Sequence, residues 1–257
     1  RQPPVSTLNL AHMVPSSAVW AGPERDDHFG APPLLYGRTE GSTPFRLSLH
    51  VGDVGHTLVV GPTGAGKSVL LALMALQFRR YARSQVFAFD FGGSIRACAL
   101  AMQGDWHDLG GELTDASETS VSLQPLARIH ETSERAWAAD WIVAILLREN
   151  IQITPEVKEH LWTALTSLAS APVGERTITG LAVLLQSNDL KQALRSYCVG
   201  GPYGRLLDAE AEHLGSADVQ AFEIEGLVGT GAAPAVLSYL FHRIGDRLDG
   251  RPTLLII

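Results

Sequence analysis

The pattern of apolar and polar positions predicts strands in the first part of the chain. Residues 34–36 and 45–51 place apolar side chains in strand-like order on either side of a turn at 40–43, and we expect a hairpin there. Residues 56–60 form a short apolar run that ends at Gly61. Such a run is typical of a parallel strand with both faces buried, so we predict a core strand over 56–60.

Helices and strands are predicted to alternate after this point. Residues 69–83 are apolar around most of the circumference of a helix, which predicts a helix buried in a core. Residues 85–91 form a second run of strand length, which Gly92 and Gly93 end, and a helix is expected over 94–102. The order strand, helix, strand, helix indicates an α/β domain.

The pattern over residues 117–203 changes to helices alone. A stripe of apolar residues predicts a helix over 133–148. The next helix has a clear start, because Thr154 is a good N-cap and Pro155 suits the first helical position. Two shorter helices are expected as well, over residues 180–186 and 189–197. The whole segment is interpreted as an all-α insertion.

The α/β pattern resumes after a glycine-rich loop at residues 200–204. A strand is predicted over 219–224, a helix over 235–248 and a buried strand over 252–257. We therefore expect four segments in the chain: a linker or arm over 1–33, the first portion of the core over 34–116, the helical insertion over 117–203, and the second portion of the core over 204–257.

Composition restricts the class of protein. Of 257 residues, 46% are hydrophobic and 18% are charged, which excludes a disordered or fibrous chain. The net charge of -7 gives no overall attraction to nucleic acid or to anionic membranes. The longest apolar runs, 69–78 and 136–147, are shorter than the roughly 20 residues of a membrane-spanning helix. Cys98 and Cys198 define neither a disulfide framework nor a CxxC metal site, so a reducing cytoplasm is expected.

One segment carries the chemistry of phosphate binding. Between the predicted strand at 56–60 and the helix after it, the chain matches the P-loop (Walker A) pattern in full. Its glycines let successive N–H groups point into one concavity at the start of a helix. We expect Lys67 to contact the β- and γ-phosphates and the Ser68 hydroxyl to ligate Mg²⁺. The predicted nucleotide-binding residues are Gly61, Pro62, Thr63, Gly64, Ala65, Gly66, Lys67 and Ser68.

Hydrolysis of a nucleotide also requires a carboxylate near the Mg²⁺. Asp90, at the end of an apolar strand, is one candidate, and the alternative is a residue that caps the next helix. Glu223 is a second candidate, although a solvated surface residue is favoured there. Arg205 is a candidate arginine finger for a neighbouring subunit, although a surface arginine is favoured. The better Walker B candidate is the strand over 253–257, and we expect its acidic pair after Ile257.

Taken together, these segments resemble the TrbE/CagE-type conjugal transfer ATPases, the large cytoplasmic ATPases of bacterial type IV secretion systems. The resemblance covers most of residues 34–257. The P-loop alone is shared by many families, and the later segments around a helical insertion make the match more specific. The segments that carry it are residues 56–68, 89–94, 122–126, 201–208 and 221–227.

The resemblance implies an α/β fold, with a RecA-like P-loop NTPase core, a mostly parallel sheet and an all-α insertion. It implies ATP and Mg²⁺ as ligands and ATPase activity in the intact protein. The partners it implies are other type IV secretion components and further copies of the chain, in a hexamer. The implied location is the cytoplasm, at the inner face of the bacterial inner membrane, with contact to the membrane only through partners. Because the Walker B acids are expected after Ile257, we expect residues 1–257 alone to hydrolyse ATP poorly.

Other functions stay open at this point. A DNA-translocating ATPase of the coupling-protein or FtsK/HerA type shares the same core, and DNA is a partner that the acidic pI of about 5.7 does not indicate. A nucleotide-binding interaction module would bind ATP without turnover. A small-molecule P-loop kinase is a weaker alternative, since no substrate-binding constellation is present. A GTPase is disfavoured because the D-x-x-G match at 90–93 is not followed by an N-K-x-D segment.

Overall fold

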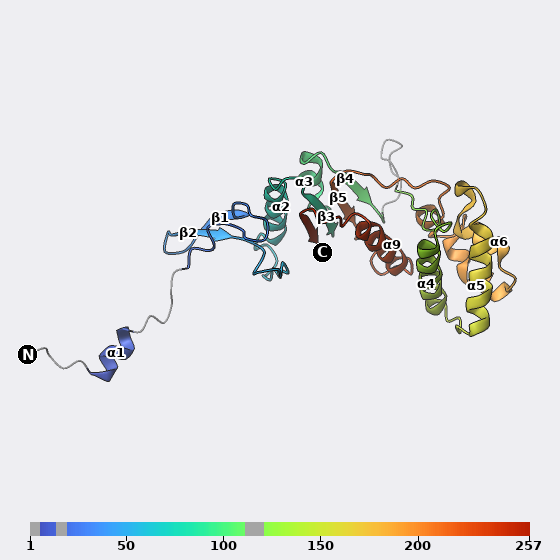
Figure 1. The fold of residues 1–257 in the computed structure, drawn as a ribbon, viewed down its shortest axis with the longest axis horizontal. Helices are drawn as coiled ribbons and strands as arrows, with labels where there is room; N and C mark the ends of the chain where they lie inside the picture. Colours follow the sequence, from blue (N-terminus) through green and yellow to red (C-terminus); the bar gives the residue numbers. More distant parts are fainter. Residues whose placement is uncertain (1–5, 14–19, 111–120) are drawn as a thin grey trace, which may run out of the picture. The chain divides into compact units, whose positions relative to one another are not determined.

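The structure is a computed structural model that describes residues 6–13, 20–110 and 121–257. The chain divides into two compact units, residues 1–81 and 82–257 (Figure 1). Unit 1 contains α1 (Thr7–Met13), a hairpin of β1 (Leu35–Arg38) and β2 (Pro44–Leu47), and α2 (Lys67–Phe78). Unit 2 contains a sheet and the remaining helices. None of the described helices is long and apolar enough to cross a membrane.

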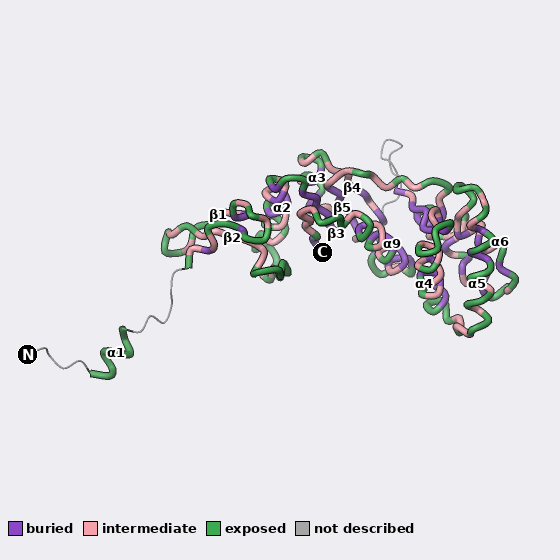
Figure 2. The backbone as a smooth tube through the Cα atoms, viewed as in Figure 1, coloured by how far each residue is buried: buried purple, intermediate pink, exposed green. Residues whose placement is uncertain are grey.

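The predicted hairpin of unit 1 is confirmed. β1 and β2 pair in antiparallel register, with Leu35 opposite Leu47. The C-terminal end of α2 is tied to the segment before the hairpin, because Arg80 donates hydrogen bonds to the carbonyl oxygens of Pro33 and Leu34 at 2.9 and 3.0 Å. The small core of unit 1 is aromatic, and its rings belong to Phe29, His50, Phe78 and Tyr81. Figure 2 shows that α1, by contrast, is exposed along its length.

Two predictions in unit 1 are wrong. Residues 56–60 form no strand, and the side chains of Leu58 and Val60 are 87% and 82% exposed. A strand forms only where a neighbour completes its hydrogen bonds, and none of the described strands pairs with 56–60. The helix predicted over 69–83 ends at Phe78, and it is not buried all round, because Val69, Leu70, Leu73 and Leu76 are exposed. The backbone of Arg83 is left-handed, with φ of 59°, which an α-helix does not accommodate.

The sheet of unit 2 is entirely parallel among the described strands. It consists of β3 (Gln85–Asp90), β4 (Asp105–Asp108), β5 (Val219–Glu223) and β6 (Thr253–Ile256), in the order β4-β5-β3-β6. Every residue of β3 and β5 is buried, including the polar Gln85, Asp90, Gln220 and Glu223. Burial was predicted for β3 but not for β5. The prediction of a buried final strand is only partly right, because Ile256 alone of β6 is buried: β6 pairs with β3 alone and forms an edge. β4 was not predicted, since its four residues contain two aspartates.

Helices cover both faces of this sheet. Phe241 of α9 (Ala233–Gly245) stacks on Phe89 of β3 with ring centroids 4.9 Å apart. On the opposite face, Arg96 of α3 (Arg96–Ala101) lies 4.3 Å above the ring of Trp106. The two faces are distinguished by the alternation along β4, where His107, next to Trp106, stacks on Phe222 of the α9 side. The predicted helices at 94–102 and 235–248 are thus confirmed.

The predicted run of helices lies between residues 132 and 197 in the structure, and residues 121–131 are not helical. Thr154 caps α5 (Pro155–Leu168), because its hydroxyl accepts a hydrogen bond from the N–H of Val157 at 3.3 Å. The helices and short 3₁₀ turns of this segment are α4 (Thr132–Arg148), α5 (Pro155–Leu168), η1 (Val173–Glu175), α6 (Ile178–Leu184), α7 (Asn188–Leu194) and η2 (Arg195–Tyr197). The short helix α8 (Gly204–Leu207) follows them.

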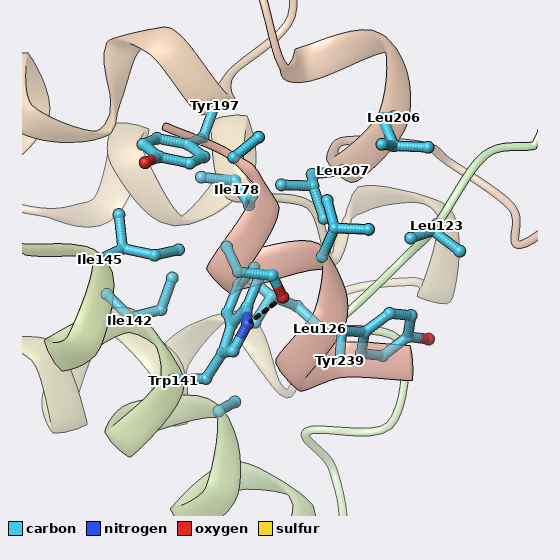
Figure 3. Packing of buried hydrophobic residues seen from close by; sticks show 14 of the residues in the cluster. Leu123, Leu126, Trp141, Ile142, Ile145, Ile178, Tyr197, Leu206, Leu207 and Tyr239 are labelled. Carbon is cyan, nitrogen blue, oxygen red and sulfur yellow. Dashed lines mark hydrogen bonds between the residues drawn. The ribbon is translucent and has the colours of Figure 1, made fainter. Parts of the chain in front are cut away.

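The helices and the sheet share one hydrophobic core. Phe87 and Phe222 of the sheet belong to the same buried cluster as the apolar stripes of α4 and α5. Trp141 of α4 reaches α9, and its indole N–H donates a 2.9 Å hydrogen bond to the carbonyl oxygen of Ala235 (Figure 3). The helical segment is therefore not an independent body beside the sheet, because its core continues into that of the sheet.

Substitution of Trp141 by phenylalanine tests this connection. We expect Trp141→Phe to lower the free energy of unfolding by about 1–3 kcal/mol, because a buried hydrogen bond is lost while most of the ring volume is kept. Trp162→Phe is the matched control, since Trp162 is 41% exposed, and a change within about 0.5 kcal/mol is expected. Urea unfolding followed by circular dichroism measures both values. Equal effects at the two positions would contradict the shared core.

Candidate nucleotide-binding site

The segment from Gly61 to Ser68 forms a loop that leads directly into α2. Gly64 and Gly66 have φ of 81° and 84°, a left-handed conformation that favours glycine. Gly66 is the N-cap of α2, and the first helical hydrogen bond runs from the N–H of Leu70 to its carbonyl at 2.9 Å. The N–H groups of the first turn have no acceptor within the helix, so they present partial positive charge at the loop.

The side chain of Lys67 closes this loop. Its ammonium donates hydrogen bonds to the carbonyl oxygens of Gly61 and Pro62, both at 2.9 Å. The ammonium is thereby held against the first two residues of the glycine-rich turn. Ser68 is exposed in the first turn of α2. This set of donors fits the phosphates of a nucleotide with Mg²⁺, because ammonium and helix N–H groups bind anionic oxygens and a hydroxyl oxygen suits Mg²⁺.

Asp90 and Glu223 lie side by side in unit 2, where they end the adjacent strands β3 and β5 in the same register. Asp90 accepts hydrogen bonds from the hydroxyl of Ser94 at 2.6 Å and from the N–H of Ile95 at 2.7 Å. It therefore organises the turn that leads into α3, but it does not cap this helix, because the N-cap of α3 is Ile95 and no described side chain caps the helix start.

The carboxylate of Glu223 is held by backbone N–H groups. It accepts hydrogen bonds from Gly92 at 3.2 Å, from Gly93, and from Glu225 at 2.8 Å. Glu223 is only 7% exposed, so the prediction of a solvated residue is wrong for it. The reason is that Gly92 and Gly93, both with positive φ, aim their N–H groups at the end of β5. The left-handed backbone at position 93, with φ of 67°, favours glycine there.

The other candidates differ in their surroundings. Arg205 lies on α8 with its side chain exposed, and Tyr203 just before it accepts a hydrogen bond from the N–H of Gly231 at 3.2 Å. The loop 61–68 belongs to unit 1, whereas Asp90, Arg205 and Glu223 belong to unit 2. Of these residues, the structure thus brings together Asp90 and Glu223, which lie at the carboxyl ends of the two central strands, β3 and β5.

A titratable group of this sheet was missed by sequence reasoning. His107 of β4 is 8% exposed and stacks on Phe222 with ring centroids 5.3 Å apart. Burial lowers the pKa of His107, while the charge of Asp105 opposes that change. The imidazole is therefore neutral at neutral pH and acts as a packing residue. The polar sequence of β4 gave no strand signal from which its burial could be predicted.

Among the described residues, one cluster has a donor set that could suit a metal ion: Glu134, His242 and Asp246. Arg128 already contacts both carboxylates of this cluster, Glu134 at 2.8 Å and Asp246 at 2.6 Å. The Glu134 carboxylate also lies 3.2 Å from Nε2 of His242. Because the guanidinium supplies the positive charge that these groups need, the cluster is an ion-pair network between α4 and α9.

The whole chain is similar in sequence to two conjugal transfer proteins. It is 43% identical over 262 residues to a probable conjugal transfer protein TrbE of Sinorhizobium fredii, and 42% identical over 264 residues to the conjugal transfer protein TrbE of Rhizobium radiobacter. Both matches cover 100% of this chain, but 39% and 32% of those proteins. The chain thus spans about a third of the length of these relatives. No protein-family model matches it.

More distant similarities extend to VirB4 proteins. The type IV secretion system protein virB4 of Bartonella quintana is 24% identical over 98% of the chain. The solved structure of VirB4 of Thermoanaerobacter pseudethanolicus matches with a TM-score of 0.64 at 16% identity, over 87% of this chain and 66% of that one. The structural match and the parallel sheet confirm the predicted α/β, RecA-like fold class.

Substitution of Glu223, at the carboxyl end of β5, tests whether its carboxylate has a structural role or is only solvated. We expect Glu223→Gln to lower the free energy of unfolding by about 1–3 kcal/mol, because an amide has one acceptor oxygen and places its donor against the backbone N–H groups. Glu225→Gln, at an exposed position two residues later, is expected to change it by less than about 0.5 kcal/mol. Chemical denaturation measures both, and a neutral Glu223→Gln would show that the carboxylate does not organise this end of the sheet.

Proposed function

Because the chain belongs to the TrbE and VirB4 family of conjugal transfer and type IV secretion proteins, we propose that it is the ATP-binding motor region of such a protein. In this proposal the region couples ATP hydrolysis to substrate transfer or pilus assembly. The observation that carries it is the loop at 61–68, where left-handed glycines and the ammonium of Lys67 surround the start of α2.

In the proposed site, the chain's own groups bind and orient the nucleotide. Backbone N–H groups of the loop and of the first turn of α2 hold the β-phosphate, and Lys67 exchanges its carbonyl partners for phosphate oxygens. The Ser68 hydroxyl holds Mg²⁺, which neutralises charge on the phosphates when it is bound. Asp90 and Glu223 act as positioning residues that hold the turn after β3, because their oxygens already accept backbone or hydroxyl hydrogen bonds.

The assembly implied by the family belongs to the same proposal. The four segments proposed are an arm over 1–33, core segments over 34–116 and 204–257, and the helical insertion over 117–203. β6 is the proposed Walker B strand, and Arg205 is the proposed contact to a neighbouring subunit. The proposed partners are other type IV secretion components and further copies of the chain, in a hexamer at the cytoplasmic face of the inner membrane.

Nucleotide binding tests the loop directly. We expect Lys67→Ala to weaken the affinity for a fluorescent ATP analogue with Mg²⁺ by about tenfold or more, because a charge-assisted hydrogen bond to phosphate is lost. Lys158→Ala, at an exposed position of α5, is the control and is expected to leave the affinity unchanged. Fluorescence titration measures both dissociation constants. If the two variants bind alike, the loop is not the nucleotide site.

Phosphate release separates the motor from the other functions. We expect residues 1–257 to bind Mg-ATP but to release phosphate slowly, because the two buried carboxylates of the sheet edge are engaged by other groups of the chain. Fast release that Glu223→Gln abolishes without unfolding would assign Glu223 a catalytic role instead. Salt-sensitive binding of DNA would favour a DNA-translocating ATPase, and ATP binding without any turnover in the full-length protein would favour an interaction module.

A further inference from the structure

A groove of about 630 Å³ opens in the helical region of unit 2. Its lining comes from the C-terminal end of α5, from η1 and from α6. Helices α5 and α6 pack against each other, and Figure 1 shows them as neighbours. The lining also includes residues that follow η2 and α8. The proposed nucleotide site uses none of these residues. The side chains that matter for its chemistry are Glu175, Val183, Leu184, Val199, Asp208 and Glu210.

The floor of the groove is fixed by a buried carboxylate. Asp208 is 4% exposed and accepts hydrogen bonds from the N–H of Thr179 at 3.0 Å, from the Thr179 hydroxyl, and from the N–H of Val199 at 2.7 Å. These bonds join the start of α6 to the segment after η2. The groove is therefore built by hydrogen bonds within the chain and does not need a ligand to shape it.

The rim of the groove is acidic. Glu175 and Glu210 are both exposed, and neither forms an ion pair with a described residue. Their segments lie against each other, because a β-carbon at Gly174 would come within 3.7 Å of the Glu210 carbonyl oxygen. Among the described residues that line the groove, none is basic. Two uncompensated carboxylates thus flank the same opening.

Aliphatic side chains complete the surface. Val183 and Val199 are 72% and 73% exposed, and Leu184 is 40% exposed, although the helices that carry or adjoin them have a fully buried core. Covering these side chains with apolar groups of a partner is favourable, because it removes them from water. They line the same groove as the acidic residues of the rim. The remaining lining consists largely of small side chains such as those of Ser170, Ala171 and Gly180, which let a backbone approach closely.

We propose that this groove docks a partner protein through a short segment in which arginine or lysine alternates with aliphatic residues. The basic side chains pair with Glu175 and Glu210, and the aliphatic ones cover Val183, Leu184 and Val199. Charge complementarity selects this occupant, because a cation is the group that two unpaired carboxylates on a rim attract. The docking is separate from nucleotide binding and does not depend on the function proposed above.

The test uses the full 257-residue chain and a short fluorescent peptide in which arginine and leucine alternate, measured by fluorescence anisotropy. The comparison peptide has glutamate in place of arginine. We expect the basic peptide to bind at least about tenfold tighter than the acidic one, with an affinity that falls as salt rises. Equal binding of the two peptides, or no binding of the basic peptide, would overturn the proposal.

Variants locate the binding. The double change Glu175→Lys with Glu210→Lys, and the pair Val183→Ser with Val199→Ser, are each expected to weaken binding by about tenfold or more. The milder Glu175→Gln with Glu210→Gln keeps the side-chain size and is expected to act in the same direction if the lysine variant fails to fold. Glu159→Lys on α5 and Leu147→Ser on α4 are the controls, since both are exposed and do not line the groove.

Two outcomes would overturn the assignment even if the basic peptide binds. One is that the controls weaken binding as much as the groove variants, which would mean general attraction to an acidic chain. The other is that the chain associates with itself and that Val183→Ser with Val199→Ser abolishes the association while the peptide has no effect. The groove would then be covered by a second copy.

Discussion

The pairing of β3 with β5 is the interaction on which the rest of unit 2 depends. It joins residues 85–90 to residues 219–223 and buries every side chain of both strands. The helices from α4 to α8 therefore lie in the sequence between two strands that are neighbours in the sheet, β3 and β5. Their hydrophobic core is continuous with that of the sheet. Two sets of contacts connect these helices to α9. One is the hydrogen bond from Trp141 to Ala235, and the other consists of the two ion pairs that Arg128 forms with Glu134 and Asp246. The same pairing places Asp90 beside Glu223 at one sheet edge.

Local signals in the sequence predicted much of this fold. The N-cap at Thr154, the proline after it and the apolar stripes located α4 and α5, and the short, largely apolar segments at 85–91 and 219–224 located β3 and β5. Two failures have a common physical cause. An apolar run such as 56–60 becomes a strand only through hydrogen bonds to a neighbour, and a polar run such as β4 becomes one because β5 offers it a free edge. Pairing partners far away in the sequence decide both outcomes, and periodicity does not contain them.

In the candidate site, too, features specified by neighbouring residues could be predicted, and features that depend on distant segments could not. The loop at 61–68 could be located from the sequence, because the glycines, the lysine and the helix start are all specified within a few residues, and its left-handed positions are those of Gly64 and Gly66. The strand predicted before it is absent, and nucleotide binding by the loop stays a prediction. The behaviour of Glu223 was not predicted, because three backbone N–H groups from two segments converge on its carboxylate. Likewise, the groove between α5 and α6 has no sequence signature. It arises from hydrogen bonds to Asp208 that join distant segments.

The loop at 61–68 and the first turn of α2 are proposed to bind the phosphates of Mg-ATP. Hydrogen–deuterium exchange of the 257-residue chain with and without Mg-ATP tests this binding most directly, because bound phosphates protect the backbone N–H groups that contact them. Slower exchange is expected in peptides that span 61–70, and no such slowing is expected in Lys67→Ala. Unchanged exchange over 61–70, with nucleotide-dependent protection confined to other segments, would contradict it.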